Sequence, residues 1–149
     1  MKKTVMPLVA CLALVGFTAS GAGAQFLLNE IRTDHSGTDV DEYVEIAGPP
    51  GASLAGVTLL VIGDTGAMNT CGVVENVHDL SAFSIQADGL FAVRISTGVP
   101  LLVGYDATIS GSLENSDNVT YMLVSGNTAA LGNDLDSAPE DGVLDSMPW

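Results

Sequence analysis

Short apolar runs separated by turn residues are the feature of this sequence that most constrains its fold. The runs are bounded by Gly, Asp, Asn or Ser, as expected for strands that alternate with tight turns. The clear runs are 26–31, 42–47, 57–62, 90–96 and 119–124, and the weaker ones are 72–77, 83–85 and 100–105. This pattern predicts about seven or eight short strands in one domain.

Apolar and polar residues alternate within two of these runs. Val44 and Ile46 fall on one face of a strand, and Tyr43 and Glu45 fall on the other, while the run 90–95 alternates in the same way. Such alternation is typical of a strand with one face toward a core. No stretch of a dozen residues shows a helical stripe free of Gly. The sequence therefore predicts an all-β fold, an antiparallel β-sandwich in which any helix is short.

The first 24 residues have the pattern of a cleavable signal peptide. Two lysines precede the apolar run 5–17, and the small residues 22–24 precede the expected cleavage point. The apolar run is shorter than the roughly 20 residues that cross a membrane as a helix. A lipid-modified Cys11 is the alternative, which we disfavour because the apolar run continues past it. We expect a secreted, periplasmic or cell-surface protein whose mature domain is 25–149.

Charge restricts the partners of that domain. The chain has 18 acidic residues and four cations, and the only cations after the leader are Arg32 and Arg94. Binding to nucleic acid or to an anionic membrane requires clustered Lys and Arg, which neutralise phosphates and release counterions. We therefore expect no direct contact with nucleic acid and no membrane insertion, and we expect the partner to be a protein or a cell-surface ligand.

A series of segments, in the same order along the chain, resembles a known family. Leu27–Ile31 contains Asn-Glu, Glu42–Ile46 reads Glu-Tyr-Val-Glu-Ile, and Leu54–Leu59 begins Leu-Ala-Gly. The later segments 87–93 and 113–123 continue the resemblance, which spans residues 26 to about 125. Together these segments resemble the lamin tail domain of the bacterial secreted type. The resemblance implies an immunoglobulin-like β-sandwich, with a further strand beyond Trp149.

The resemblance also implies a function. Modules of this family usually have no catalytic residues and are often joined to secreted nucleases, phosphoesterases or surface-anchoring segments. We expect a secreted, non-catalytic module for adhesion, surface display or recruitment, and no enzyme in this chain. The alternative is an N-terminal accessory domain of a larger secreted nuclease or phosphoesterase. A glycan-binding sandwich is a third hypothesis, which the few aromatic residues of the chain make less attractive.

The segment 132–146 is the strongest candidate for a metal site. Ca²⁺ takes six to eight oxygen ligands, and acidic residues close together in a flexible loop supply them. The spacing resembles thrombospondin type 3 calcium repeats with three extra residues, and it is not an EF-hand, because Pro139 stands where that motif has Gly. A solvated acidic loop is the alternative. The candidate ligands are Asp134, Asp136, Glu140, Asp141 and Asp145.

Two other groups of acidic residues carry weaker hypotheses. A cluster around Gly37 consists of Asp34, Asp39, Asp41 and Glu42, which we interpret as polar residues of a turn. A second group, Glu30 and Glu45, lies on adjacent predicted strands, so the two carboxylates are expected to face each other. Paired carboxylates perform acid–base chemistry in glycosidases, but the flanking sequence lacks an aromatic-rich sugar groove.

The remaining reactive side chains form no recognisable catalytic motif. Cys71 is the only cysteine after the leader, so we expect a buried thiol, an intermolecular disulfide or a partner residue beyond this chain. His35 and His78 are predicted to be exposed loop residues. No Gly-x-Ser-x-Gly elbow is present, and the histidines and cysteine are not spaced as zinc ligands.

Overall fold

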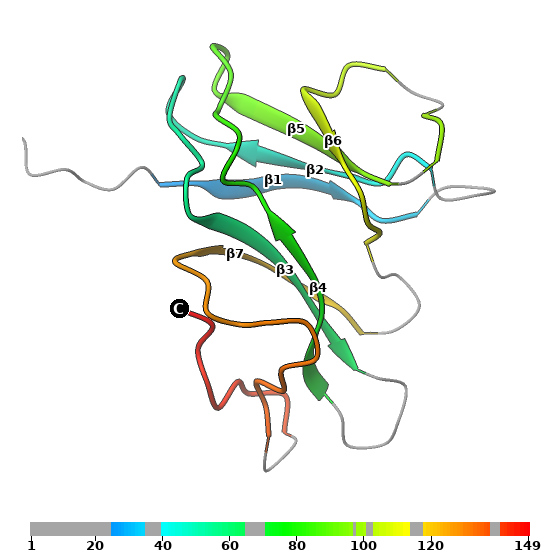
Figure 1. Ribbon diagram of the computed structural model, residues 1–149, viewed down its shortest axis with the longest axis vertical. Helices are drawn as coiled ribbons and strands as arrows, with labels where there is room; N and C mark the ends of the chain where they lie inside the picture. Colours follow the sequence, from blue (N-terminus) through cyan, green and yellow to red (C-terminus); the bar gives the residue numbers. More distant parts are fainter. Residues whose placement is uncertain are drawn as a thin grey trace, which may run out of the picture.

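The chain folds as an all-β sandwich, which confirms the predicted fold class (Figure 1). The computed structural model describes residues 25–34, 40–64, 71–96, 98–100, 103–113, 118–137 and 141–149. Those ranges contain no helix, and hence none that is long and apolar enough to cross a membrane. The strands are β1 (Leu27–Arg32), β2 (Tyr43–Ala47), β3 (Val57–Asp64), β4 (Cys71–Asp79), β5 (Leu90–Ile95), β6 (Ala107–Ile109) and β7 (Thr120–Ser125).

The strands form two sheets of four and three strands. One sheet has the order β1-β2-β5-β6, and the other has the order β4-β3-β7. Neighbouring strands are antiparallel except β5 and β6, which are parallel. The chain passes from the first sheet to the second after β2, returns after β4, and passes again after β6. These crossings join the two layers at several points along the sequence.

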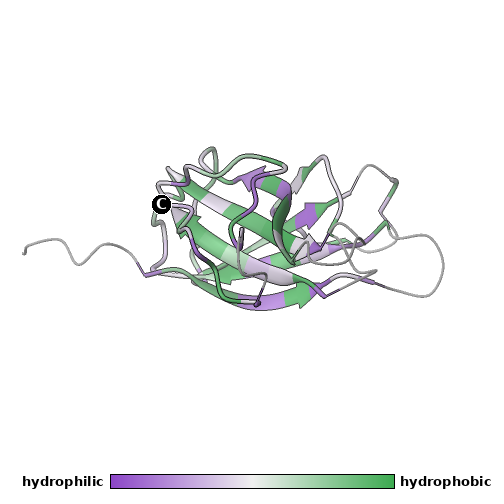
Figure 2. Cartoon of the chain, turned by 90° about the horizontal axis from the view of Figure 1, so that it is seen from below, coloured by the Kyte–Doolittle hydropathy of each residue, from purple (hydrophilic) through white to green (hydrophobic). Residues whose placement is uncertain are grey.

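The main core lies between the two sheets, as the alternation of apolar residues predicts. Val44 pairs with Val93, and Ile46 pairs with Phe91, so the alternate residues of β2 and β5 point to one side. Leu59 and Val61 of β3 belong to the same buried cluster. Figure 2 shows apolar segments along the strands of both layers, interrupted by polar ones. Tyr43 and Glu45 therefore lie on the outer face of the four-stranded sheet.

Strand β3 differs from β2 because it is buried on both faces. Leu60 and Ile62 point away from the main core and form a second cluster with Val74 and Val124. Leu135, from the C-terminal segment 127–149, completes this cluster, and Leu144 packs against it. The C-terminal segment thus covers the outer face of the three-stranded sheet. The uninterrupted apolar sequence of β3 is consistent with a strand covered on both sides.

Hydrogen bonds attach this segment to the edge of β4. Val74 N donates to Asn133 O at 2.8 Å, and Gly132 N donates to Val74 O at 2.7 Å. Leu135 N donates to Gly72 O at 3.0 Å. A Cβ atom at Gly72 would lie 2.5 Å from Cβ of Asp136, and the Gly72 φ is +81°. Glycine is required there because a side chain would hold the segment away from β4.

The predicted strand positions differ from the structure in three places. The five clear runs are confirmed, and 72–77 lies within β4. The weak run 83–85 is no strand: Ser84 makes a single bridge with Ser53, because the chain turns on both sides of it. In the run 100–105, the described residues are loop. β6 was not predicted, since three residues that pair only with β5 carry no recognisable periodicity.

Candidate functional site

Two carboxylates face each other on the outer face of the four-stranded sheet. Glu30 of β1 is paired with Glu45 of β2 in the antiparallel register, which confirms the prediction that they face each other. A register shift between Leu28 and Glu30 leaves Asn29 between two paired positions. Like charges directly opposite each other destabilise a strand pair, so this arrangement needs compensating contacts.

Neutral side chains provide those contacts. The Tyr43 hydroxyl donates to Glu30 Oε1 at 2.5 Å, and Asn29 Nδ2 donates to Glu45 Oε1 at 2.6 Å. The hydrogen bond to Glu30, together with partial burial and the nearby negative charges, raises the pKa of Tyr43 to about 12. Tyr43 therefore remains a neutral phenol, and it orients Glu30 without cancelling its charge.

Beside this carboxylate pair lies a small depression lined by two tyrosines that contact each other, which we call the tyrosine groove. The ring centroids of Tyr43 and Tyr105 are 5.6 Å apart, with the planes tilted by 50°. The volume of the groove is about 220 Å³. Burial, with a contribution from the charge of Asp41, raises the pKa of Tyr105 above its usual value. The lining residues are Tyr43, Glu45, Ala92, Val103, Gly104 and Tyr105.

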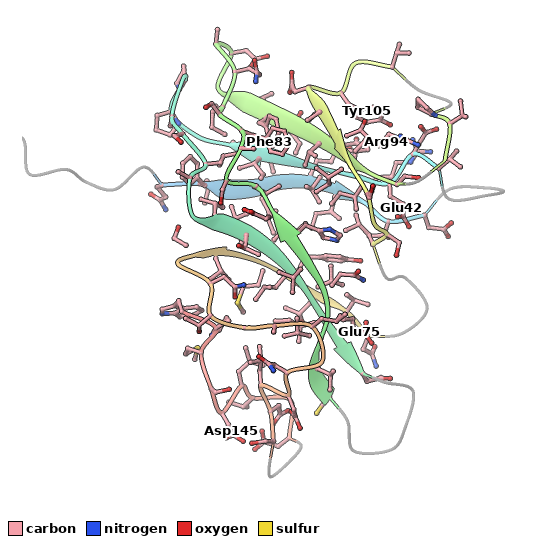
Figure 3. The ribbon with its side chains drawn as sticks, viewed as in Figure 1. Glu42, Glu75, Phe83, Arg94, Tyr105 and Asp145 are labelled. Atoms are coloured by element: carbon pink, nitrogen blue, oxygen red, sulfur yellow. The ribbon has the colours of Figure 1, made fainter. Side chains whose placement is uncertain are left out.

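A buried polar cluster lies close to Tyr105 (Figure 3). Arg94 points to the outer side of β5 but is almost fully buried, since its Nε donates to Val40 O at 2.7 Å and its Nη2 donates to Gly98 O. Asp41 Oδ1 lies 4.0 Å from Arg94 Nε. Desolvating a charge is costly unless it is paired and hydrogen-bonded, and these contacts meet that requirement.

This cluster corrects the interpretation of the acidic residues around Gly37 as one polar turn. Asp41 and Glu42 are buried, and Glu42 Oε2 accepts a hydrogen bond from Leu113 N at 2.8 Å. Asp34 is exposed, and Asp39 lies outside the described residues. The sequence did not distinguish the two pairs, because the buried pair depends on Arg94 and Leu113, which are far away in the chain.

The candidate calcium ligands are placed around the C-terminal segment. Asp134 Oδ1 accepts from Asp136 N at 3.0 Å, and Asp141 Oδ1 accepts from Val143 N at 3.0 Å. Asp145 is exposed, and Glu140 lies outside the described residues. Within the ranges that the structure describes, no three His, Cys, Asp or Glu side chains are close enough to share a metal ion. The calcium site stays a prediction, and the side chains of Asp134 and Asp141 accept hydrogen bonds from the backbone of their own turns.

Asp136 occupies a different environment from the other acids of this segment. It is fully buried, and its Oδ2 accepts from Cys71 Sγ at 2.9 Å and from Gly142 N at 2.8 Å. The hydrogen bond from Cys71, followed by those from Gly142 and Asp141, lowers the pKa of Asp136 against the opposing effect of desolvation. Its Oδ1 has no hydrogen-bond partner in the described part of the chain.

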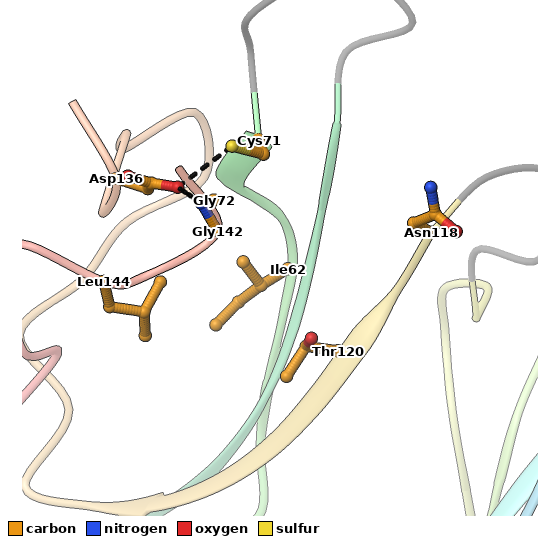
Figure 4. A pocket seen from close by; sticks show the side chains of 8 residues that line it. All are labelled: Ile62, Cys71, Gly72, Asn118, Thr120, Asp136, Gly142 and Leu144. Atoms are coloured by element: carbon orange, nitrogen blue, oxygen red, sulfur yellow. Dashed lines mark hydrogen bonds between the residues drawn. The ribbon is translucent and has the colours of Figure 1, made fainter. Parts of the chain in front are cut away.

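These residues border a pocket of about 310 Å³ (Figure 4). Cys71, Asp136 and Gly142 lie on one side of it, and Asn118 and Thr120 lie across from them. Ile62, Gly72 and Leu144 complete the lining. Cys71 is a partly exposed free thiol, and its Sγ donates to Asp136 Oδ2.

The prediction of an exposed His78 is wrong. His78 lies in β4, opposite Leu59, and only 5% of it is exposed. Its ring is 3.3 Å from Ser112 O, and a Cβ atom at Gly111 would lie 2.7 Å from the ring, so glycine permits the close approach. Burial lowers the pKa of His78, and the contact with Ser112 partly opposes this effect. His35 lies outside the described residues.

The fold and the outer-face site together define a β-sandwich protein with an acidic, aromatic groove on one sheet. No family model, curated protein or solved structure matches the chain. The lamin-tail resemblance therefore stays a prediction. The tyrosine groove was missed from the sequence because Tyr105 is the last residue of the weak run 100–105 and meets Tyr43 only through the pairing of β2, β5 and β6.

Proposed function

We propose that this chain is a secreted, non-catalytic binding module for adhesion, surface display or recruitment, and that it recognises its ligand at the tyrosine groove. The observation that carries this proposal is the tyrosine groove, with Tyr43 and Tyr105 set beside the paired carboxylates Glu30 and Glu45. Tyrosines contribute large contact areas at small entropic cost, and they are enriched where proteins bind one another.

The position of the groove supports a role in binding. Tyr43, Glu45 and Ala92 belong to the central strands β2 and β5, which are fixed by the core beneath them. A site on such elements is held more precisely than a site on loops. Val103 lines the groove and is 96% exposed, so the rim offers apolar surface to a partner.

A paired-variant binding experiment tests the proposal. The protein and its Val103→Ser/Tyr105→Ser variant are applied to arrays of peptides and glycans, after circular dichroism has shown that both are folded. We expect the protein to retain ligands that the variant does not, because the groove has lost its apolar rim and one aromatic wall. Equal retention by the two proteins, or turnover of ester, phosphodiester or glycoside substrates by the purified chain, would contradict the proposal.

The alternative predicted from the sequence, an accessory domain of a secreted nuclease or phosphoesterase, is tested by the gene sequence downstream of Trp149. An open reading frame that encodes a domain rich in metal ligands supports the accessory role. A stop codon directly after Trp149 would rule out the accessory role. The groove has the same binding role in both cases.

A further inference from the structure

The tyrosine groove is acidic as well as aromatic, and this combination selects one class of ligand. Glu45 lines the groove, and Glu30 lies opposite Glu45 in the register. The hydrogen bonds from Tyr43 and Asn29 come from neutral groups, so both negative charges remain. A further carboxylate, Asp106, follows Tyr105 and accepts a hydrogen bond from Ala92 N at 2.8 Å.

Neither arginine of the described chain forms a salt bridge with this pair. Arg94 is buried against Val40, Gly98 and Asp41. Arg32 is paired with Tyr43 in the register and lies on the same face, where its charge acts on Tyr105 and opposes the rise in the pKa of that phenol. No salt bridge joins Arg32 to Glu30 or Glu45 in the part of the chain that the structure describes. The repulsion between the two carboxylates is therefore compensated only in part.

The size of the groove limits what enters it. Pockets that enclose a drug-sized ligand begin at roughly 300 Å³, and the tyrosine groove, at about 220 Å³, is smaller. Its occupant is therefore one side chain or one sugar ring of a larger ligand. Charge distinguishes these two, because a cation relieves the repulsion between Glu30 and Glu45, whereas a neutral sugar does not.

We propose that the tyrosine groove binds a protonated lysine or arginine side chain of a partner protein, so that this module is a receptor for a basic segment. The cation lies against the tyrosine rings, which attract it through their negative faces. Glu45 accepts a charge-assisted hydrogen bond, for which a carboxylate has several lone pairs besides the one that Asn29 uses. The apolar stem of the side chain packs on Ala92 and Val103. This inference rests on the proposed function.

Two matched peptides test the charge of the ligand. The probes are acetyl-Gly-Lys-Gly-Lys-Gly-amide and its norleucine analogue, titrated into the ¹⁵N-labelled protein while the amide resonances of Ala92 and Gly104 are followed. We expect saturable shifts with the lysine peptide and about tenfold weaker binding of the norleucine peptide, since a cation–π contact and an ion pair are lost together. Salt at about 1 M, where the Debye length is about 3 Å, should lower the affinity for the lysine peptide more than the affinity for the norleucine peptide.

Variants of the groove test its geometry. Glu45→Gln should lower the affinity for the lysine peptide by about two- to fivefold, as expected for the loss of one exposed ion pair. Tyr105→Leu keeps an apolar side chain in the groove but removes an aromatic ring. It should lower the affinity for the lysine peptide by a similar factor. Asp145→Asn changes the net charge by the same amount at the far end of the molecule (Figure 3), and it should leave the affinity unchanged.

The outcomes separate this inference from the proposed function. Equal binding of the two peptides, or equal effects of Glu45→Gln and Asp145→Asn, would overturn the inference. A neutral oligosaccharide that shifts the Ala92 and Gly104 resonances independently of salt would also overturn it, but would support a binding module. If no peptide or glycan shifts these resonances, both the inference and the proposed function are wrong.

Discussion

The outer face of the β1-β2-β5-β6 sheet is open to solvent over β1 and β2, although Arg94 of β5 is buried there, whereas the outer face of the β4-β3-β7 sheet is covered by the described residues of the C-terminal segment. The sequences of the strands account for this difference. β2 alternates, so its outward residues are Tyr43 and Glu45, which tolerate water. β3 is apolar at nearly every position, and its outward Leu60 and Ile62 require a cover. One outer face is thus buried under the C-terminal segment, and the other keeps polar side chains in contact with solvent.

The accessible face rests on the buried cluster of Arg94, and removing that cation should have the largest effect on stability. Arg94→Met leaves Asp41 buried without its cation and should lower the free energy of unfolding by about 3–5 kcal/mol. Urea denaturation measures the change. Arg32→Met on the same sheet is the control and should cost less than about 1 kcal/mol. Equal costs would show that the cluster does not support this face.

The covered face depends on apolar contacts with the C-terminal segment. Leu135→Ala removes the most buried of these contacts and should cost about 2 kcal/mol, the lower end of the range for buried leucines, because the site is near the surface. Leu131 lies in the same segment but is 69% exposed, so Leu131→Ala should change the free energy of unfolding by no more than about 0.5 kcal/mol. A cost of Leu135→Ala no greater than that of Leu131→Ala would show that the segment does not act as a cover.

A pH titration tests His78, which lies opposite Leu59 of the main core between the two sheets. Burial lowers the pKa of His78 in the folded state below its usual value of 6.5. Below about pH 6.5 the unfolded state therefore binds a proton that the folded state does not, and stability falls as the pH decreases. The slope contributed by one proton is at most about 1.4 kcal/mol per pH unit.

His78→Gln separates this contribution from that of the many carboxylates. The variant should show a shallower loss of stability between about pH 6.5 and pH 5, whatever its stability at neutral pH, because glutamine does not titrate. Thermal melts at several pH values measure the slope. Identical slopes for the protein and the variant would show that His78 accepts a proton as readily in the folded state as in the unfolded state.

Calcium should have the smallest effect, and it should act on the covered face alone. A site in the acidic segment that is half occupied adds about 0.4 kcal/mol to the free energy of unfolding. Sites in extracellular proteins bind Ca²⁺ at about 10⁻⁴ to 10⁻³ M. We expect the melting temperature to rise slightly when millimolar Ca²⁺ replaces EDTA, and Asp136→Asn to reduce the rise. No change with either reagent would exclude the calcium site.

The sequence was sufficient to predict those parts of the fold that depend on local patterns. The alternation in β2 and β5 placed Val44, Ile46 and Phe91 in the core, and the facing pair Glu30 and Glu45 followed from two adjacent strands. The cover was not predicted, because Leu135 stands alone between two aspartates and Leu144 follows a single apolar residue in an acidic segment. Their burial depends on the outer face of β3, which is distant in the sequence.

The candidate site was predicted only in part for a similar reason. The carboxylates belong to consecutive strands, but the tyrosine groove also needs Tyr105, which meets Tyr43 through the strand order of the sheet. The burial of Asp41 and His78 likewise depends on contacts with Arg94 and Ser112 that no short-range pattern reveals. Polar residues in short segments were therefore interpreted as exposed, although tertiary contacts bury them.

The attachment of the C-terminal segment has a mechanical consequence. The last residues are held by bonds such as those from Asp145 N to Leu135 O and from Leu135 N to Gly72 O. A force applied at the C-terminus reaches these bonds before it reaches β7, which precedes the segment in the chain. Tension would thus peel the cover away and expose Leu60 and Ile62, while the tyrosine groove, on the opposite sheet, keeps its shape.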